Sequence, residues 1–216
     1  MDKKKISETI KELKEKNKRN FKQTFDLIIT LKDLDLKKPE EHVDFFAQLH
    51  YPIGKKITTC ALVGPELRAS AKEACDFFVS VEEFDKYSKD PKSVKKLAEK
   101  YDYFIAQANV MPKVAAAFGK VLGKRGKMPN PKAGCVVPPN ANLKVLVETL
   151  QKTVKLSAKT SLMVQAMVGK EDGAEEQIID NILTAYDALI HHTLRGKNNV
   201  NKVLLKLTMS KPIRID

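Results

Sequence analysis

Hydrophobic and polar residues alternate at both ends of the chain in the manner of half-buried β-strands. In residues 21–31 (FKQTFDLIITL) the apolar positions of one face are Phe25, Leu27, Ile29 and Leu31. The same period of two recurs in residues 42–49, 162–168 and 202–209. Because successive side chains of a strand point to opposite faces, each segment predicts a strand with one buried and one open face.

Two helices are predicted beside these strands. Ile6, Ile10 and Leu13 recur at helical spacing near the N-terminus. A longer helix is expected from about residue 174 to residue 194, with an inward face that comprises Ile178, Ile182, Leu189 and Leu194. This combination predicts an α+β sheet with helices on one face.

The middle of the chain has a different rhythm. Residues 57–63 form a continuous apolar run, which is typical of a strand buried on both faces. Further strands are expected at 77–81 and 103–107, and helices after Gly64, around 92–100, from about 110 and near 143–152. Strands and helices that alternate at this spacing predict a parallel sheet in a doubly wound, Rossmann-like α/β domain.

These two patterns divide the chain into two expected domains. Residues 1–56 and 154–216 are expected to form one discontinuous α+β domain, into which the α/β domain of residues 57–153 is inserted. Pro52, Gly54 and the lysines that follow are a plausible first hinge, and the segment near Thr153 is a second.

The charge of the chain favours an anionic partner. The formal net charge is +12 and the isoelectric point is about 9.5, which indicates nucleic acid or an anionic membrane surface. A basic surface that serves only solubility is the alternative. No apolar run approaches the ~18–20 residues of a membrane-spanning helix, and the charged N-terminus shows no apolar signal region.

Metal binding and side-chain catalysis find little support in the sequence. Cys60, Cys75 and Cys135 show no CxxC motif and no ligand spacing with the four histidines, so we expect reduced structural thiols in a cytoplasmic protein, no metal and no cofactor. No local nucleophile motif is present. A nucleotide-binding enzyme of the α/β type is an alternative that rests only on the rhythm of the middle domain.

A long stretch of the middle domain contains no acidic residue. Residues 103–147 lack Asp and Glu but carry Lys113, Lys120, Lys124, Arg125, Lys127, Lys132 and Lys144. We therefore expect a locally positive, unscreened potential, centred on an irregular loop at residues 119–134 (GKVLGKRGKMPNPKAG). Neither a phosphate-binding G-x-x-x-x-G-K-[ST] loop nor a G-x-G-x-x-G fingerprint fits this segment. A plain linker is the other interpretation, although five basic residues are more than a linker requires.

Two large apolar residues near the chain ends have two interpretations each. Met209 in LTMSKPIRID continues the alternation of its strand and is either a core residue or an exposed contact, and Phe21 has the same ambiguity. The paired aromatic motif of the common RNA-recognition domain is absent, so base stacking on paired aromatics is not expected.

Several motifs together resemble one protein family. They are GKRGKMPNPKAG (123–134), FKQTFDL (21–27), Lys159-Thr160 before a strand, VGK (168–170) and TMSKPIRI (208–215). Over essentially the whole chain they resemble the large-subunit ribosomal protein one family, and Lys124, where bacterial members have Pro, makes the resemblance archaeal.

The resemblance implies a structural protein with no enzymatic activity, in the large ribosomal subunit of the cytoplasm. Its implied partners are the rRNA of the mobile stalk at the tRNA exit site, the exit-site tRNA whose release it assists, and its own mRNA, whose translation it represses. It also implies a monomer when free. Ser210 stands where the family usually has Gly, and Phe25 where it usually has Val.

The resemblance also implies the binding residues. The expected rRNA and mRNA site comprises Phe21, Lys22, Thr24, Asp26, Lys159, Thr160, Lys170, Lys202, Thr208, Met209 and Ser210. A secondary, tRNA-facing loop is expected to present Lys124, Arg125, Lys127 and Lys132.

Overall fold

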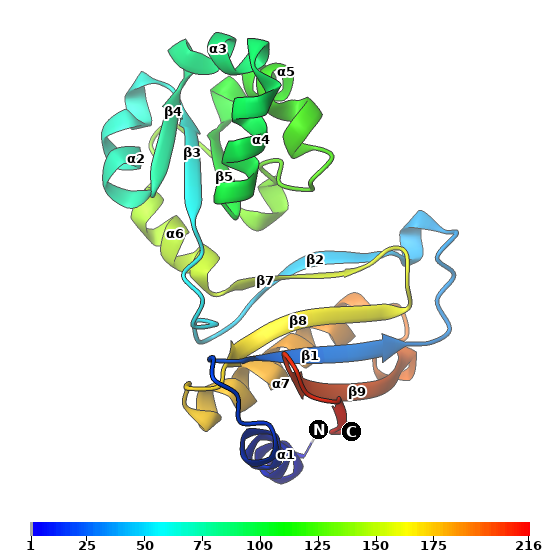
Figure 1. Cartoon of the computed structure of the whole chain (residues 1–216). Helices are drawn as coiled ribbons and strands as arrows, with labels where there is room; N and C mark the ends of the chain where they lie inside the picture. The colour runs from blue at the N-terminus through cyan, green and yellow to red at the C-terminus, as the bar shows by residue number, and fades with distance from the viewer. Residues whose placement is uncertain (1) are drawn as a thin grey trace. The chain divides into compact units, whose positions relative to one another are not determined.

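The computed structural model describes residues 2–216 of the chain (Figure 1). Its contacts divide it into a terminal unit, which runs from the N-terminus to Lys55 and from Lys152 to Asp216, and an inserted unit, Lys56–Gln151. These limits fall one and two residues before the domain boundaries expected from the sequence. The shift at the second limit has a local cause, because the Leu49 N–H donates to the Lys152 carbonyl at 2.8 Å and so ties that residue to the terminal unit.

A four-stranded antiparallel sheet joins the two ends of the chain in the terminal unit. Its order is β10-β9-β1-β8, and its strands are β1 (Thr24–Leu31), β8 (Met163–Lys170), β9 (Val200–Leu207) and β10 (Ile213–Arg214). Burial alternates strictly along β1. The α+β architecture expected from the period of two is therefore confirmed.

A second, two-stranded ribbon lies beside this sheet in the terminal unit (Figure 1). It pairs β2 (Val43–Gln48) with β7 (Thr153–Ala158) in antiparallel register. The sequence did not predict β7, since only Lys152 separates it from the preceding helix and no turn signal marks its start. Its alternate residues Val154, Leu156 and Ala158 are buried in the core of the same unit.

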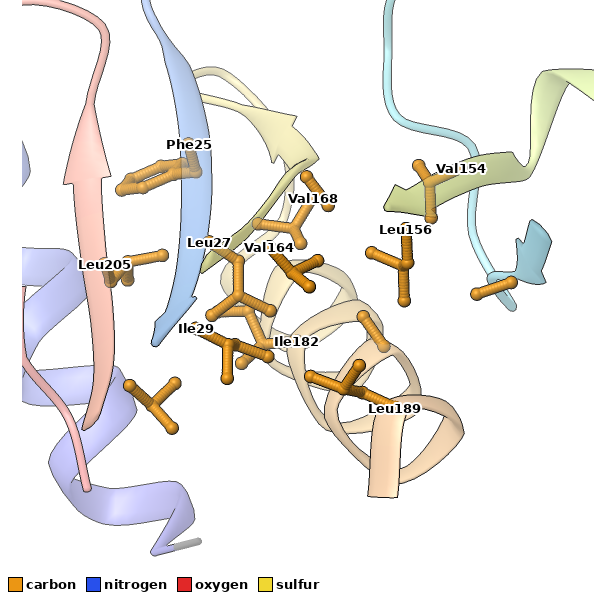
Figure 2. Close-up of a cluster of buried hydrophobic side chains, with 14 of the residues drawn as sticks. Phe25, Leu27, Ile29, Val154, Leu156, Val164, Val168, Ile182, Leu189 and Leu205 are labelled. Atoms are coloured by element: carbon orange, nitrogen blue, oxygen red, sulfur yellow. The ribbon is translucent and has the colours of Figure 1, made fainter. Parts of the chain in front are cut away.

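Two helices bury one face of the terminal sheet. They are α1 (Lys3–Lys16) and α7 (Glu175–His192), and their apolar residues share one core with the inward residues of the strands. In Figure 2, Leu27, Ile29 and Val164 of the strands lie toward Ile182 and Leu189 of α7. The prediction that Leu194 points inward was wrong, because α7 ends at His192, Thr193 is extended and Leu194 is 72% exposed.

The inserted unit contains a parallel sheet with helices on both faces. The strand order is β4-β3-β5-β6, with β3 (Thr59–Val63), β4 (Phe77–Ser80), β5 (Tyr103–Gln107) and β6 (Val136–Val137). Its helices are α2 (Arg68–Ala74), α3 (Phe84–Lys89), α4 (Pro91–Lys100), α5 (Met111–Leu122) and α6 (Leu143–Gln151). One core joins α3, α4 and α5 to the sheet and another joins α2 and α6, so the predicted doubly wound α/β fold is confirmed.

Candidate RNA-binding surface

A tight turn follows β9 and presents Met209 to solvent. The strand was expected to continue to residue 209 but ends at Leu207, because Ser210 forms hydrogen bonds to Leu207 and so closes a turn. The Ser210 N–H donates to the Leu207 carbonyl at 3.1 Å, and the Leu207 N–H donates to Ser210 Oγ at 2.8 Å. Met209 is consequently 62% exposed, which decides against the core interpretation of this methionine.

Phe21 is also a surface residue, because β1 begins three residues later than the alternation predicted. It is 49% exposed and lines a shallow groove of about 340 Å³ together with Arg19, Asn20, Lys22, Glu171 and Asp172. A large aromatic side chain at this exposure is available to a partner.

The pairing of β1 brings most of the predicted site residues to one end of the terminal sheet. The Thr24 N–H donates to Thr208 Oγ1 at 3.1 Å, and Thr24 lies opposite Lys170 on the other neighbouring strand. We call this region the turn end of the sheet; it comprises Phe21, Lys22, Thr24, Asp26, Lys170, Thr208, Met209 and Ser210.

The other predicted residues lie at the opposite end of the same sheet. Lys202 pairs with Thr30, and Lys159 and Thr160 belong to the β7–β8 loop, whose Leu162 carbonyl accepts from the Leu31 N–H at 2.8 Å. Six residues of strand at about 3.3 Å each separate the two ends by roughly 20 Å. The predicted residues therefore form two groups rather than one site.

Several of the predicted cations already have acidic partners. Lys22 Nζ donates to Asp172 at 2.6 Å, and this hydrogen bond raises the pKa of the lysine. Lys159 Nζ lies 2.6 Å from Asp44. Burial acts to raise the pKa of Asp44, but the ammonium groups of Lys159 and Lys155 outweigh it and leave that pKa lowered.

Asp26 is a partly desolvated carboxylate on the open face of the sheet. Burial raises its pKa, and the ammonium of Lys206, which pairs with it in register on β9, opposes part of that effect. Lys206 was not predicted as a site residue. Its spacing of four residues from Lys202, an even number, did indicate that both lysines share the face opposite the buried Val203, Leu205 and Leu207.

The basic loop of the inserted unit is less exposed than its sequence suggested. Its first residues, up to Leu122, form the last turn of α5. Arg125 Nη2 donates to Glu99 Oε1 at 2.8 Å, and Lys127 Nζ donates to the carbonyls of Ala98 and Tyr101 at 2.9 and 2.7 Å. The expectation of an unscreened loop was therefore wrong, since α4 and the residue that follows it, both outside the acid-free stretch, supply the partners.

Two loop cations retain the expected accessibility. Lys124 and Lys132 are exposed, and neither ammonium has a hydrogen-bond or ion-pair partner within residues 2–216. The tRNA-facing surface that the sequence predicted is thus reduced from four candidate cations to these two.

The crevice where a doubly wound sheet usually binds a nucleotide is filled by protein. In such sheets the ligand lies outside the carboxyl ends of the strands, at the switch point between neighbours such as β3 and β5. Here Gln107 Oε1 accepts from the Gly64 N–H at 2.9 Å, and its Nε2 donates to Glu66 at 2.8 Å. The buried side chain of Gln107 thus uses the Gly64 N–H, the backbone donor that would otherwise face a phosphate, so this crevice offers no phosphate-binding site.

The three cysteines are free thiols, two of them buried. Burial raises the pKa of Cys60 to about 12 and that of Cys135 to about 11, so neither is a ready nucleophile at neutral pH.

In residues 2–216 there is no group of three or more His, Cys, Asp or Glu side chains arranged to hold a metal ion. The same residues contain no helix with the length and apolar character needed to span a membrane.

Comparison with known proteins decides the family. The model of the ribosomal protein L1p/L10e family matches residues 13–211. The chain belongs to this family. The resemblance inferred from the sequence motifs is thereby confirmed, and the chain is a member of a family of ribosomal proteins rather than of an enzyme family.

Similar members of the L1p/L10e family include archaeal proteins named large ribosomal subunit protein uL1. The chain is 37% identical to that of Thermococcus kodakarensis over 217 residues, which cover 100% of this chain and 98% of the relative. It is 38% identical to that of Nanoarchaeum equitans over 210 residues, 95% of this chain and 97% of the relative. The corresponding protein of Methanocaldococcus jannaschii is 35% identical over 216 residues, 100% of this chain and 96% of the relative.

Proposed function

We propose that this protein is a structural component of the large ribosomal subunit that binds rRNA of the mobile stalk through the turn end of its terminal sheet. The observation that carries the proposal is the joint exposure of Met209 and Phe21 beside the hydrogen-bonded strand ends of Thr24 and Thr208. Exposed apolar residues that are rimmed by polar groups mark interaction sites when they gather in one place, and the bond from the Met209 N–H to Gln23 ties Met209 to the segment that carries Phe21.

The chemistry of the turn end suits folded RNA. Folded RNA is recognised largely by its shape, its 2′-hydroxyls and its phosphates. The Asp26 carboxylate and the hydroxyl of Thr208 are acceptors for ribose hydroxyls, while Met209 and Phe21 exclude water from these hydrogen bonds and so strengthen them. Lys170 and Lys206 lie on the strands that flank Asp26 and supply positive charge for phosphates.

The cations at the opposite end of the sheet extend this surface. Lys202 is exposed on β9, and Lys159 is half exposed although it pairs with Asp44. Asp44 would keep the ammonium of Lys155, 3.5 Å away, as a partner, so a phosphate can replace Asp44 as the partner of Lys159. RNA that crosses the open face of the sheet, over roughly 20 Å, therefore meets both groups of predicted residues.

The inserted unit has a secondary role in this proposal. Lys124 and Lys132 would meet exit-site tRNA once the protein is bound to the subunit, and in this way assist the release of deacylated tRNA. The free protein is proposed to be a monomer that also binds its own mRNA at the turn end and represses its translation.

Competition between two RNAs tests the shared site. We expect an unlabelled transcript of the rRNA stalk to displace a labelled fragment of the protein's own mRNA completely in filter binding at fixed salt, because one surface contacts both. The Leu194→Asp variant is the control and should show the same competition, since Leu194 is exposed on the terminal unit and the whole of β9 lies between it and Met209. Residual mRNA binding at saturating rRNA would show that the repressor site is separate.

A further inference from the structure

Gln23 is a buried polar side chain beneath the exposed residues of the turn end. It is 0% exposed, whereas its neighbours Phe21 and Lys22 face solvent. Its carboxamide bonds to backbone groups far apart in the sequence: Nε2 donates to the Asn17 carbonyl at 2.6 Å, and Oε1 accepts from the Met209 N–H at 3.2 Å.

The backbone of Gln23 is held as firmly as its side chain. Its N–H donates to Glu171 Oε2 at 3.2 Å, and its carbonyl accepts from the Glu171 N–H at 2.9 Å. Asn17 in turn ends α1 and donates from Nδ2 to the Leu13 carbonyl at 3.1 Å. Gln23 therefore joins the end of α1, the loop after β8 and the turn after β9.

We infer that Gln23 is the positioning residue of the RNA-binding surface, which fixes Met209 relative to Phe21 before RNA binds. The inference rests on the proposed function and adds a residue that does not itself face the RNA. The two flanks of the turn are held by other bonds, Thr208 to Thr24 and Ser210 to Leu207. The backbone N–H of Met209, between these flanks, is bonded to Gln23.

The chemistry of the two backbone groups explains why this residue is glutamine. The Met209 N–H can only donate and the Asn17 carbonyl can only accept, so the bridging side chain must offer one acceptor and one donor. Glutamate would accept from Met209 but would set a second acceptor against the Asn17 carbonyl. Methionine has the length of glutamine but satisfies neither group.

Loss of this bridge would leave Met209 ordered only at the moment of binding. A contact residue that is fixed in advance avoids an ordering cost when the partner arrives. Gln23 thus acts on RNA affinity through Met209, and the two residues should be energetically coupled.

A double-mutant cycle in the full chain tests the coupling. We expect Gln23→Met and Met209→Ala each to weaken binding of a stalk-rRNA transcript about tenfold, and the double variant to bind about as weakly as Met209→Ala alone. The matched control is Gln177→Met, the same chemical change at an exposed position of α7, which should leave affinity unchanged. Amide exchange should accelerate at Met209 in Gln23→Met while that of Leu205 in the core strand stays slow.

The outcomes separate the inference from the proposed function. The positioning role of Gln23 would be overturned if the affinity loss of the double variant equals the product of the two single losses, or if amide exchange at Met209 is unchanged in Gln23→Met. Either result would leave the RNA site intact. Full affinity in Met209→Ala would remove the proposed RNA site and the inference with it. If Gln23→Met does not fold, Gln23→Asn replaces it with the same expectation, because its carboxamide is one methylene too short to bridge both backbone groups.

Discussion

Met209→Asp should weaken binding of the rRNA stalk about a hundredfold, or ~3 kcal/mol, while the protein remains folded. The fold is preserved because Met209 is 62% exposed and its backbone N–H keeps its bond to Gln23. The affinity falls for two reasons: the apolar contact is lost, and a carboxylate is placed where the proposed RNA backbone lies. Filter binding at fixed salt measures the change.

The control for this prediction is Leu194→Asp. It makes the same kind of change at a residue that is 72% exposed in the same unit. Leu194 precedes the start of β9 and Met209 follows its end, so the length of an eight-residue strand, roughly 25 Å, separates them. Equal losses in the two variants would mean that added negative charge, rather than the contact at Met209, weakens binding.

Lys127→Met should destabilise the inserted unit by about 2 kcal/mol and leave the affinity for stalk rRNA unchanged. The lysine donates two hydrogen bonds to the carbonyls of Ala98 and Tyr101 at the C-terminal end of α4, and the net contribution of a hydrogen bond to a charged group is about 1.5–3 kcal/mol. Amide hydrogen exchange in α4 reports the effect on this unit, with protection lowered about 30-fold.

Lys124→Met is the matched variant for Lys127→Met. Lys124 is exposed three positions earlier in the same loop and has no partner in the described part of the chain. It should leave exchange in α4 unaltered. Equal amide exchange rates in α4 for the two variants would contradict the structural role of Lys127.

Residue patterns predicted the elements whose burial repeats regularly. The period of two in β1 and the continuous apolar run of β3 follow from the faces that these strands bury, so both were visible in the sequence. β7 was not visible, because it follows α6 after a single residue. The end of β9 was placed two residues late, since the side chain of Ser210 closes the turn and composition does not show that bond.

The residues of the candidate site could be named from the sequence, but the partners that they contact could not. The resemblance named Met209 and Phe21, and the structure exposes both. The sequence could not show that Lys127 serves α4 or that Arg125 meets Glu99, because these partners are distant along the chain. Gln23 escaped notice for a related reason: a polar residue at an inward position has a meaning only once the backbone groups that it bonds are known.

Hydroxyl-radical footprinting of the protein with and without the rRNA stalk tests the central claim most directly. Met209 and Met128 provide an internal comparison, since one lies in the turn of the terminal unit and the other in the basic loop of the inserted unit. We predict that rRNA lowers oxidation at Met209 and Phe21 severalfold and leaves Met128 and Leu194 unchanged. Protection confined to Met128 and the residues around Lys124, with Met209 still oxidised, would contradict the assignment of the rRNA site to the terminal unit.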